Sequence, residues 1–409
     1  MKCKNPCIMP WYNGAYPPSY KHQPLKLREK ATEIANAIST YARAHDRLIT
    51  KVLIPDQNVA AGTLRLVVIV GTYQELKFQG NRWFSRELLE ERLGIKPGDE
   101  VRLSTLEAGV NWVNANPFRQ IKVMIDEVPN QPGKGSLVVG VQEARPFRAA
   151  FTGDNTGNEV IGKQRYSAAF QFGNLWGRDH QGSYQFLTTS KVDAYKGHAL
   201  DYRLPLPSRH FLQLSSSHVR TNPTFANGVL TQEGKSFMAN VRYVIPLKGG
   251  EEPQELSFGT SFKSSNNNLD FIGTEEALRV DSDSTDTFQI SGSFSTVKRD
   301  KKGAWALGVS LYASPGNINS RNTDAAFEEA RSGGVSSYIY GSVAIQRSLT
   351  LKPGWELSMR GVFQRSSHNL LAGEQLSIGG SGSVRGYNDN VYTAENGFIL
   401  NNDLTFPLL

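Results

Sequence analysis

Apolar and polar residues alternate along several segments in the last two thirds of the chain. The clearest are residues 237–245, 256–263, 305–311 and 355–364. Successive side chains on a strand point to opposite faces, so this period of two predicts strands with one apolar and one polar face. Strands of about ten residues with such faces are typical of barrels that span an outer membrane.

The connections between the predicted strands give a second, independent signal. Strands are predicted near residues 147, 163, 180, 197, 210, 235, 255, 286, 302, 335, 355 and 396. Every second connection is short, at residues 174–177, 205–208, 246–253, 298–302 and 352–354. Longer loops are predicted around residues 220–234, 266–285, 315–334 and 367–395. Short turns alternating with long loops favour a barrel of about twelve strands over a soluble β-sandwich, which would alternate without this asymmetry.

The first third of the chain has a different pattern. Residues 27–45 predict an amphipathic helix, followed by strands at 48–54 and 64–70. The expected apolar face of that helix consists of Leu27, Ala31, Ile34, Ala35, Ile38 and Tyr41. Residues 75–143 then predict a β-α-α-β-β unit, in which Ser85 caps the first helix and Ser104 the second. The first segment looks like the second half of such a unit, and two unrelated α+β pieces are the alternative.

Length and composition narrow the class of protein. The chain has 409 residues, 39% of them hydrophobic, and a net charge of +7. It is too long for one ordinary domain and too apolar for a disordered chain. The sequence contains no uninterrupted apolar stretch of about 18 residues, which argues against a helical membrane protein.

Candidate chemistry is sparse. Both cysteines, Cys3 and Cys7, lie at the start, and the only early histidines are His22 and His45. A zinc site would need a more complete ligand set, so an irrelevant N-terminal pair is the preferred interpretation and no metal is expected. We find no nucleotide-binding glycine loop, no basic-aromatic stripe for nucleic acid, and no triad spacing for an enzyme. We therefore expect no cofactor and no catalytic residue.

A short stretch near the C-terminus stands out. Residues 376–387 are too rich in Gly and Ser for a helix or an ordinary strand. They carry a single cation, Arg385, flanked by Val384, Gly386 and Tyr387. A flexible surface loop is the usual interpretation of such a stretch. Its position between two predicted barrel strands favours the interpretation that it is a functional loop.

Several short motifs occur in a fixed order. They are Pro55-Asp56-Gln57, Gly62-Thr63-Leu64, Asn116-Pro117-Phe118-Arg119, Asp154-Asn155-Thr156-Gly157, Gly173-Asn174-Leu175-Trp176-Gly177, Leu204-Pro205-Leu206-Pro207 and Val384-Arg385-Gly386-Tyr387. In this order the chain resembles, from about residue 25, the outer-membrane transporters of two-partner secretion. These are the TpsB proteins of the ShlB/FhaC/HecB haemolysin secretion/activation family, in the superfamily that includes BamA.

The resemblance implies periplasmic α+β POTRA modules followed by an antiparallel transmembrane β-barrel. The expected domains are an N-terminal segment outside the resemblance that is expected to be disordered (1–24), a partial first POTRA module (25–71), a second POTRA module (72–145), and an incomplete barrel (146–409) with a pore loop at 367–395. The family barrel has about 16 strands, of which about 12 are expected here. A signal peptide, a plug helix and the front of the first module are also expected to be missing, as from a chain truncated at both ends.

The implied function is export, in two-partner (type Vb) secretion. A large unfolded haemolysin/haemagglutinin-type exoprotein would pass from the periplasm to the cell surface, with or without activation. The partner's N-terminal secretion domain would add as a strand to the second POTRA module near Ile121, Val123 and Ile125, whose alternative role is core packing. The expected location is the outer membrane, in contact with its lipid, with the modules in the periplasm and neither nucleotide nor nucleic acid involved.

The pore loop carries the sharpest residue-level prediction. By resemblance, Val384, Arg385, Gly386 and Tyr387 form the tip of a loop that folds back into the pore, with Tyr387 against the barrel wall. A buried guanidinium needs carboxylate or carbonyl partners, and Asp403 is predicted to face the barrel interior on the last strand. A solvated loop arginine is the alternative. The rival functions are a BamA-type assembly factor, a passive porin and an enzyme. The assembly factor would carry more POTRA modules, and Phe in place of Tyr after Val-Arg-Gly.

Overall fold

The structure is a computed structural model that describes residues 24–57, 63–128, 131, 133–157, 159–225, 229–247, 252–272, 277–380, 383–384, 386–387 and 390–407. The chain forms two compact units. The N-terminal unit ends at Pro146 and also includes Gly177–Asp179, and the C-terminal unit holds the remainder. Each unit is described by itself below.

Among the helices formed by the described residues, none has the length and apolar character needed to cross a membrane.

The N-terminal unit begins with a helix and a two-stranded sheet. Helix α1 (Pro24–Ala44) precedes strands β1 (Thr50–Leu53) and β2 (Val67–Val70), which pair antiparallel. Ala31 and Ala35 are buried, in agreement with the predicted apolar face. Tyr41 does not belong to that face, because 66% of it is exposed and its ring stacks on His45 at a centroid distance of 3.8 Å.

The predicted β-α-α-β-β unit follows and is confirmed. It consists of β3 (Thr72–Gln79), α2 (Arg86–Leu93), α3 (Leu103–Asn114), β4 (Arg119–Glu127) and β5 (Lys134–Glu143). In the three-stranded sheet β5 is central, parallel to β3 and antiparallel to β4. Leu89 and Leu93 of α2 pack with Leu137 and Val139 of β5 in a fully buried core. The division of the N-terminal unit into two modules at residue 71 remains a prediction.

The two helix caps differ from one another. Ser85 caps α2 as predicted, since its hydroxyl accepts a hydrogen bond from the Leu88 amide at 3.2 Å. The prediction for Ser104 is wrong, because α3 begins at Leu103 and its N-cap is therefore Arg102. The Arg102 side chain makes no capping hydrogen bond. Asp46 takes that role: its carboxylate accepts bonds from the Ser104 amide at 2.6 Å and the Ser104 hydroxyl at 2.7 Å. A carboxylate is favourable there because it faces the positive end of the helix dipole.

A buried ion pair explains part of the motif at residues 116–119. Both terminal nitrogens of Arg119 donate to the Asp179 carboxylate at 2.7 Å, a bidentate geometry. The Asn116 side chain donates to the same carboxylate at 2.7 Å. Arg92 lies 3.4 Å from it. All four residues are buried, so the charge of Asp179 is balanced within the N-terminal unit.

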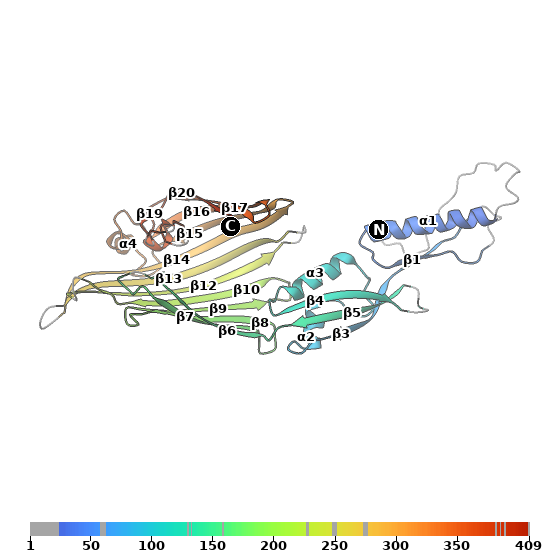
Figure 1. The fold of residues 1–409 in the computed structure, drawn as a ribbon, viewed down its shortest axis with the longest axis horizontal. Helices are drawn as coiled ribbons and strands as arrows, with labels where there is room; N and C mark the ends of the chain where they lie inside the picture. Colours follow the sequence, from blue (N-terminus) through green and yellow to red (C-terminus); the bar gives the residue numbers. More distant parts are fainter. Residues whose placement is uncertain are drawn as a thin grey trace. The chain divides into compact units, whose positions relative to one another are not determined.

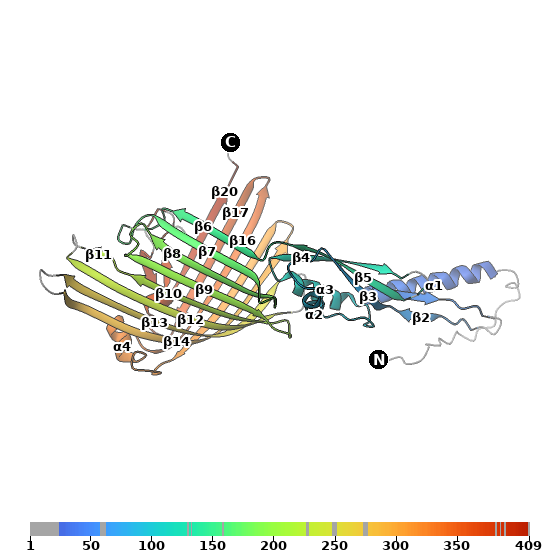
Figure 2. The ribbon, with the colours of Figure 1, turned by 90° about the horizontal axis from the view of Figure 1, so that it is seen from below.

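The C-terminal unit is one large antiparallel sheet (Figures 1 and 2). Its strand order is β20-β17-β16-β15-β14-β13-β12-β10-β9-β8-β7-β6, so neighbours in sequence are neighbours in the sheet. The bounds are β6 Phe147–Asp154, β7 Arg165–Leu175, β8 His180–Thr189, β9 Tyr195–Pro205, β10 Phe211–Thr221, β12 Leu230–Pro246, β13 Gln254–Ile272, β14 Ala277–Asp300, β15 Gly303–Pro315, β16 Ser337–Lys352, β17 Trp355–Ser366 and β20 Gly397–Thr405. A short strand, β11 (Thr224–Phe225), pairs with β12. These twelve long strands match the predicted number and positions.

The two faces of this sheet have opposite polarity. On the face called the outer face below, Phe258, Leu311 and Phe363 are exposed. On the opposite, inner face, Ser257, Gln289 and Gln364 are buried. An apolar exterior and a polar interior are what a barrel strand needs in lipid, because exterior side chains meet hydrocarbon.

Two predicted loops are in fact strands. Residues 230–234 belong to β12, and β13 and β14 extend through most of the region predicted as a loop at 266–285. The polar segments Asn266–Asn268 and Ser282–Ser284 pair with each other across these strands. Their composition looks like a loop because both faces of the sheet are polar there. The predicted short turns at 174–177, 205–208, 298–302 and 352–354 remain, and the connection at 246–253 lies partly outside the described residues. We call the side of the sheet with the short turns the short-turn end and the opposite side the loop end.

Candidate functional site

The segment between β17 and β20 is folded. It contains a turn of 3-10 helix, η4 (Ala372–Glu374), and two strands, β18 (Leu376–Ile378) and β19 (Tyr392–Ala394), which pair antiparallel. The Gly/Ser-rich stretch therefore starts from a small hairpin. We keep the name pore loop for residues 367–395.

Glu374 attaches the pore loop to two barrel strands. Its carboxylate lies 3.3 Å from the Lys263 ammonium of β13 and accepts a hydrogen bond from the Tyr340 hydroxyl of β16 at 2.9 Å. Both partners lie on the inner face, since Lys263 alternates with Phe262 and Tyr340 with Ile339. The side chain of Glu374 is 13% exposed, so the pair is shielded from solvent.

Further contacts hold both legs of the pore loop. Gln364 of β17 donates to the Glu374 carbonyl at 3.0 Å and to the Glu395 carbonyl at 3.3 Å. Arg331 pairs with the Glu395 carboxylate and donates to the Leu370 carbonyl. These interactions join the beginning and the end of the loop to the same part of the inner face.

The connection between β15 and β16 packs beside the pore loop. It contains helix α4 (Asp324–Ala330), whose Phe327 is buried with Tyr338, Tyr340 and Leu370 of the loop. Asp324 accepts hydrogen bonds from the Ser336 amide at 2.8 Å and the Ser336 hydroxyl at 2.7 Å. These bonds, the backbone one first, lower the pKa of the Asp324 carboxyl. An aromatic cluster and a fixed connection thus support the loop.

The tip of the pore loop meets the last strand. Ser383 donates to the Gly379 carbonyl and accepts from the Gly379 amide, both at 2.7 Å. The Asn401 side chain of β20 donates to the Ser383 carbonyl at 2.7 Å. Phe398, Leu400 and Leu404 of β20 are exposed on the outer face, so Asn401 reaches the loop from the inner face.

The four motif residues differ in what the structure describes. Arg385 lies outside the described residues, so its pairing with Asp403 remains a prediction. Asp403 lies two residues after Asn401 on the same face of β20. Gly386 has a φ of 92°, a left-handed conformation that favours glycine. Tyr387 is 63% exposed and Val384 is also exposed; packing of Tyr387 against the barrel wall remains a prediction.

The proposed binding strand of the second module is β4. It is an edge strand of its three-stranded sheet, as a site for strand addition requires. Ile121 is buried, and Val123 and Ile125 pack against the same core. These three side chains therefore pack the module, which was the alternative interpretation, while partner binding at the edge remains a prediction.

Sequence reasoning missed Lys263, Gln364, Glu374 and Asn401 as loop contacts. Alternation had already placed Lys263, Gln364 and Asn401 on polar faces. Asp403 was preferred because a charged partner was sought for Arg385. Within the described residues no group of three or more His, Cys, Asp or Glu side chains is arranged to hold a metal ion; Cys3 and Cys7 lie outside that part of the chain.

A sheet of twelve long antiparallel strands with an apolar exterior, a folded loop on its inner face and preceding POTRA-like modules defines an outer-membrane β-barrel transporter. The chain belongs to the family of the haemolysin secretion/activation proteins ShlB/FhaC/HecB, whose family model matches residues 133–409. The resemblance drawn from the sequence motifs is thereby confirmed, as is the location in the outer membrane.

Curated relatives are distant in sequence. The heme/hemopexin transporter protein HuxB of Haemophilus influenzae is 19% identical over 377 residues, which cover 90% of this chain and 64% of HuxB. The outer membrane transporter CdiB-2 of Burkholderia pseudomallei is 22% identical over 144 residues, 35% of this chain and 24% of CdiB-2. The chain thus spans less than two thirds of the length of these relatives.

Solved structures share the fold. CdiB from Escherichia coli matches with a TM-score of 0.75 at 17% identity, over 92% of this chain and 69% of that one. BamA from Haemophilus ducreyi, lacking POTRA domains 1–3, matches with a TM-score of 0.51 at 14% identity, over 88% of this chain and 70% of that one. The fold agrees more fully with the first.

Proposed function

We propose that the full-length protein is the outer-membrane translocator of a two-partner secretion system. It exports a large unfolded exoprotein of the haemolysin/haemagglutinin type from the periplasm to the cell surface. Its role is transport and not catalysis, and no cofactor or nucleotide takes part. The relatives support this proposal, because HuxB and CdiB-2 are both transporter proteins.

The observation that carries the proposal is the attachment of the pore loop to the inner face. Glu374 joins β13 and β16, and Asn401 holds the loop near its tip. A loop held in the interior by a few polar contacts occupies the path of an exported chain. It can also be released as a unit, because an ion pair and single hydrogen bonds each contribute only a few kcal/mol or less.

Two finer parts of the mechanism belong to the same proposal. Arg385 pairs with Asp403 or with another inner-face carboxylate and fixes the loop tip. The secretion domain of the partner adds as an extended strand to the free edge of β4, where backbone groups supply the affinity. The edge position of β4 supports the second part, and the Asn401 contact beside Asp403 supports the first.

Surface detection of a co-expressed candidate exoprotein tests the function, in a strain without other such transporters. The full-length protein is expected to export it, and Arg385→Ala is expected to abolish export at an unchanged amount of folded barrel. Arg365→Ala is the matched control, because Arg365 is an exposed arginine on the outer face of β17. Export by Arg385→Ala at the normal rate would contradict the role of the loop tip.

A BamA-type assembly factor is the second candidate, and the fold match to BamA is the observation in its favour. The same strain distinguishes the two functions. If the full-length protein inserts but exports no partner, and other outer-membrane proteins fail to assemble without it, the assembly function replaces export.

A further inference from the structure

Three cations lie side by side on the outer face of the sheet. Arg220 of β10 is directly opposite Lys196 of β9 and Lys235 of β12. Like charges in directly opposed positions destabilise a sheet. We call these three residues the cation row. Such an arrangement needs a compensating anion.

The anions that the protein supplies are insufficient. Glu233 serves two of the cations, with Arg220 at 2.9 Å and Lys235 at 3.0 Å. Asp193 lies 3.1 Å from Lys196, but its side chain is 96% exposed and screened by water. The side chains of Lys196, Arg220 and Lys235 remain 43%, 53% and 48% exposed. They are therefore available to an external anion.

The cation row lies at the border of the apolar band. Proceeding from Lys196 along the outer positions of β9, His198 comes next, followed by Leu200, Tyr202 and Leu204. Tyr202 contacts His180 and Trp176, as in the aromatic girdle at a membrane interface. Tyr202 is six positions after Lys196, which corresponds to roughly 20 Å along a strand. This distance is close to the height of a lipid-facing band, about 25 Å. The row thus lies where lipid head groups begin, at the loop end.

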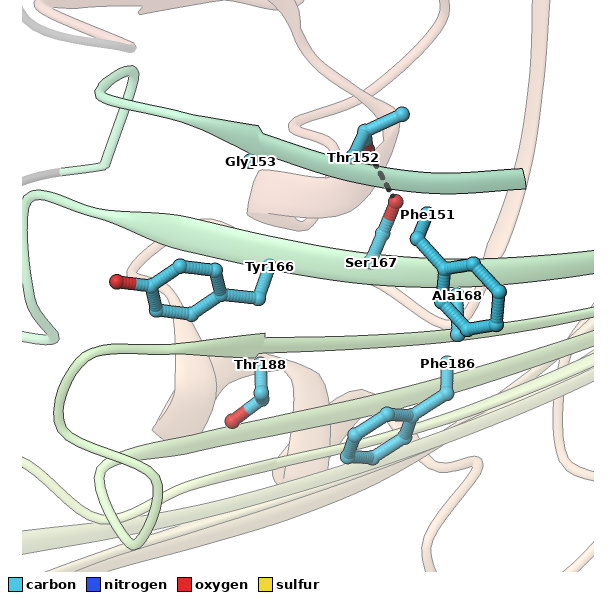
Figure 3. Close-up of a pocket in the computed structure, with 8 residues that line it drawn as sticks. All are labelled: Phe151, Thr152, Gly153, Tyr166, Ser167, Ala168, Phe186 and Thr188. Carbon is cyan, nitrogen blue, oxygen red and sulfur yellow. Dashed lines mark hydrogen bonds between the residues drawn. The ribbon is translucent and has the colours of Figure 1, made fainter.

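An apolar groove lies next to the row on the same face. It is a shallow, open groove with a volume of about 400 Å³ (Figure 3). Phe151, Tyr166 and Phe186 line it, with Gly153 and Ala168 between them, and Thr152, Ser167 and Thr188 complete the lining. Phe186 and Thr188, at its border, stand directly opposite His198 and Lys196. The polar groups of the groove are hydroxyls, and those of Thr152 and Ser167 are hydrogen-bonded to each other at 2.6 Å, so a mainly apolar groove in this band suits a hydrocarbon chain.

We propose that the outer face binds one phosphorylated glycolipid of the outer leaflet. A lipid phosphate lies against Lys196, Arg220 and Lys235, and an acyl chain fills the groove beside Phe151. Charge complementarity at the head-group level and an apolar groove within reach identify the ligand chemistry. The inference rests on the location of the protein in the outer membrane and is independent of export.

Native mass spectrometry of the delipidated full-length protein in detergent tests the proposal. The probes are lipid A with its phosphates, dephosphorylated lipid A, and phosphatidylglycerol. We expect phosphorylated lipid A to bind at least about tenfold more tightly than the dephosphorylated form. Equal binding of the two forms, or equal binding of phosphatidylglycerol, would overturn the assignment to a phosphorylated glycolipid.

Three variants separate the phosphate site from the groove. The triple variant Lys196→Gln, Arg220→Gln, Lys235→Gln is expected to lose the preference for phosphate. The control removes the same charge at the short-turn end, with Lys298→Gln, Lys301→Gln and Lys302→Gln, and is expected to keep it. The proposed site is contradicted if both triple variants keep the preference for phosphorylated lipid A, or if both lose it.

The groove variant is Gly153→Leu. A Cβ at Gly153 would meet its nearest neighbour, Tyr166, at 3.6 Å, so the backbone tolerates a side chain there. We expect weaker binding of both forms of lipid A with the phosphate preference intact. Unchanged affinity in this variant would exclude the groove as the acyl-chain site. Heat-modifiable migration in electrophoresis verifies that each variant is folded.

Discussion

The Lys263 ammonium lies 3.3 Å from the Glu374 carboxylate, although 111 residues separate the two in sequence. The pair joins β13 to the pore loop, and Tyr340 of β16 completes the carboxylate's hydrogen bonding. Gln364, Arg331 and Asn401 supply the other polar contacts that hold the loop. Its position on the inner face therefore depends on a small number of polar contacts that substitution can test.

Glu374→Ala is expected to release the pore loop without unfolding the barrel. The change removes both the ion pair with Lys263 and the hydrogen bond from Tyr340. Together these contribute more free energy than one typical hydrogen bond. Hydrogen exchange of the β18 and β19 amides in the full-length protein should accelerate by about tenfold or more. Glu356→Ala, near the short-turn end of β17, is the matched control. Equal exchange in both variants would mean that Glu374 does not hold the loop.

Asn401→Ala is expected to loosen the loop tip alone. It removes the donor to the Ser383 carbonyl, a bond of 2.7 Å. Exchange at the amides of Gly380 and Ser383 should increase severalfold, while the β18 and β19 amides stay protected. Asn402→Ala provides the comparison, because this neighbour points to the other face of β20. Similar effects of the two substitutions would argue against the inner-face contact.

Arg119→Ala is expected to destabilise the N-terminal unit by about 3 kcal/mol, since it leaves the buried Asp179 carboxylate without its bidentate partner. Arg92, at 3.4 Å, compensates in part. Native-state hydrogen exchange at Leu137 and Val139 measures the change in the full-length protein. Arg82→Ala is the control, because Arg82 is exposed and its charge stacks on Trp83. A loss below 1 kcal/mol would show that Arg119 is not essential.

Asp46 should make the stability of α3 depend on acid. The hydrogen bond from the Ser104 hydroxyl, followed by that from its amide, lowers the pKa of Asp46 below its ordinary value of 3.8. A lowered pKa stabilises the fold above the ordinary value, and the contribution disappears as pH falls through the lowered one. Exchange of the α3 amides should therefore separate wild type from Asp46→Asn at pH 7, by about 0.5 kcal/mol or less because only the charge is lost at an exposed site, and not below the lowered pKa. A difference that persists in acid would refute this capping role.

Most of the fold was predictable because its rules are local. Alternation of side chains located the twelve long strands, and Ser85 was recognised as a cap from its position before a helix. The errors arose where composition was ambiguous. Asn266–Asn268 looked like a loop because three consecutive polar residues show no alternation, although Asn268 is buried and bonded to Asn266 and Ser282. Tyr41 continued an apolar pattern that the packing does not use.

The site was predictable only in outline. The motif at residues 384–387 identified the loop, but its attachment depends on pairs far apart in sequence, such as Lys263 with Glu374. Asp46 likewise replaced the expected Ser104 cap from 58 residues away. Local patterns contain no information on which of several inner-face polar residues a loop will contact, because that choice is made by tertiary packing.

The lengths of β13 and β14 determine which part of the protein is most accessible at the cell surface. These strands have 19 and 24 residues, whereas crossing a membrane takes about 9–11. The surplus rises roughly 30 Å beyond the apolar band, with Ser264, Asn266 and Asn268 first and the exposed Phe271, Leu278 and Val280 nearer its tip. An antibody or a phage approaching the bacterium meets this hairpin before it meets the channel. An epitope inserted there would mark the cell surface without touching the pore loop.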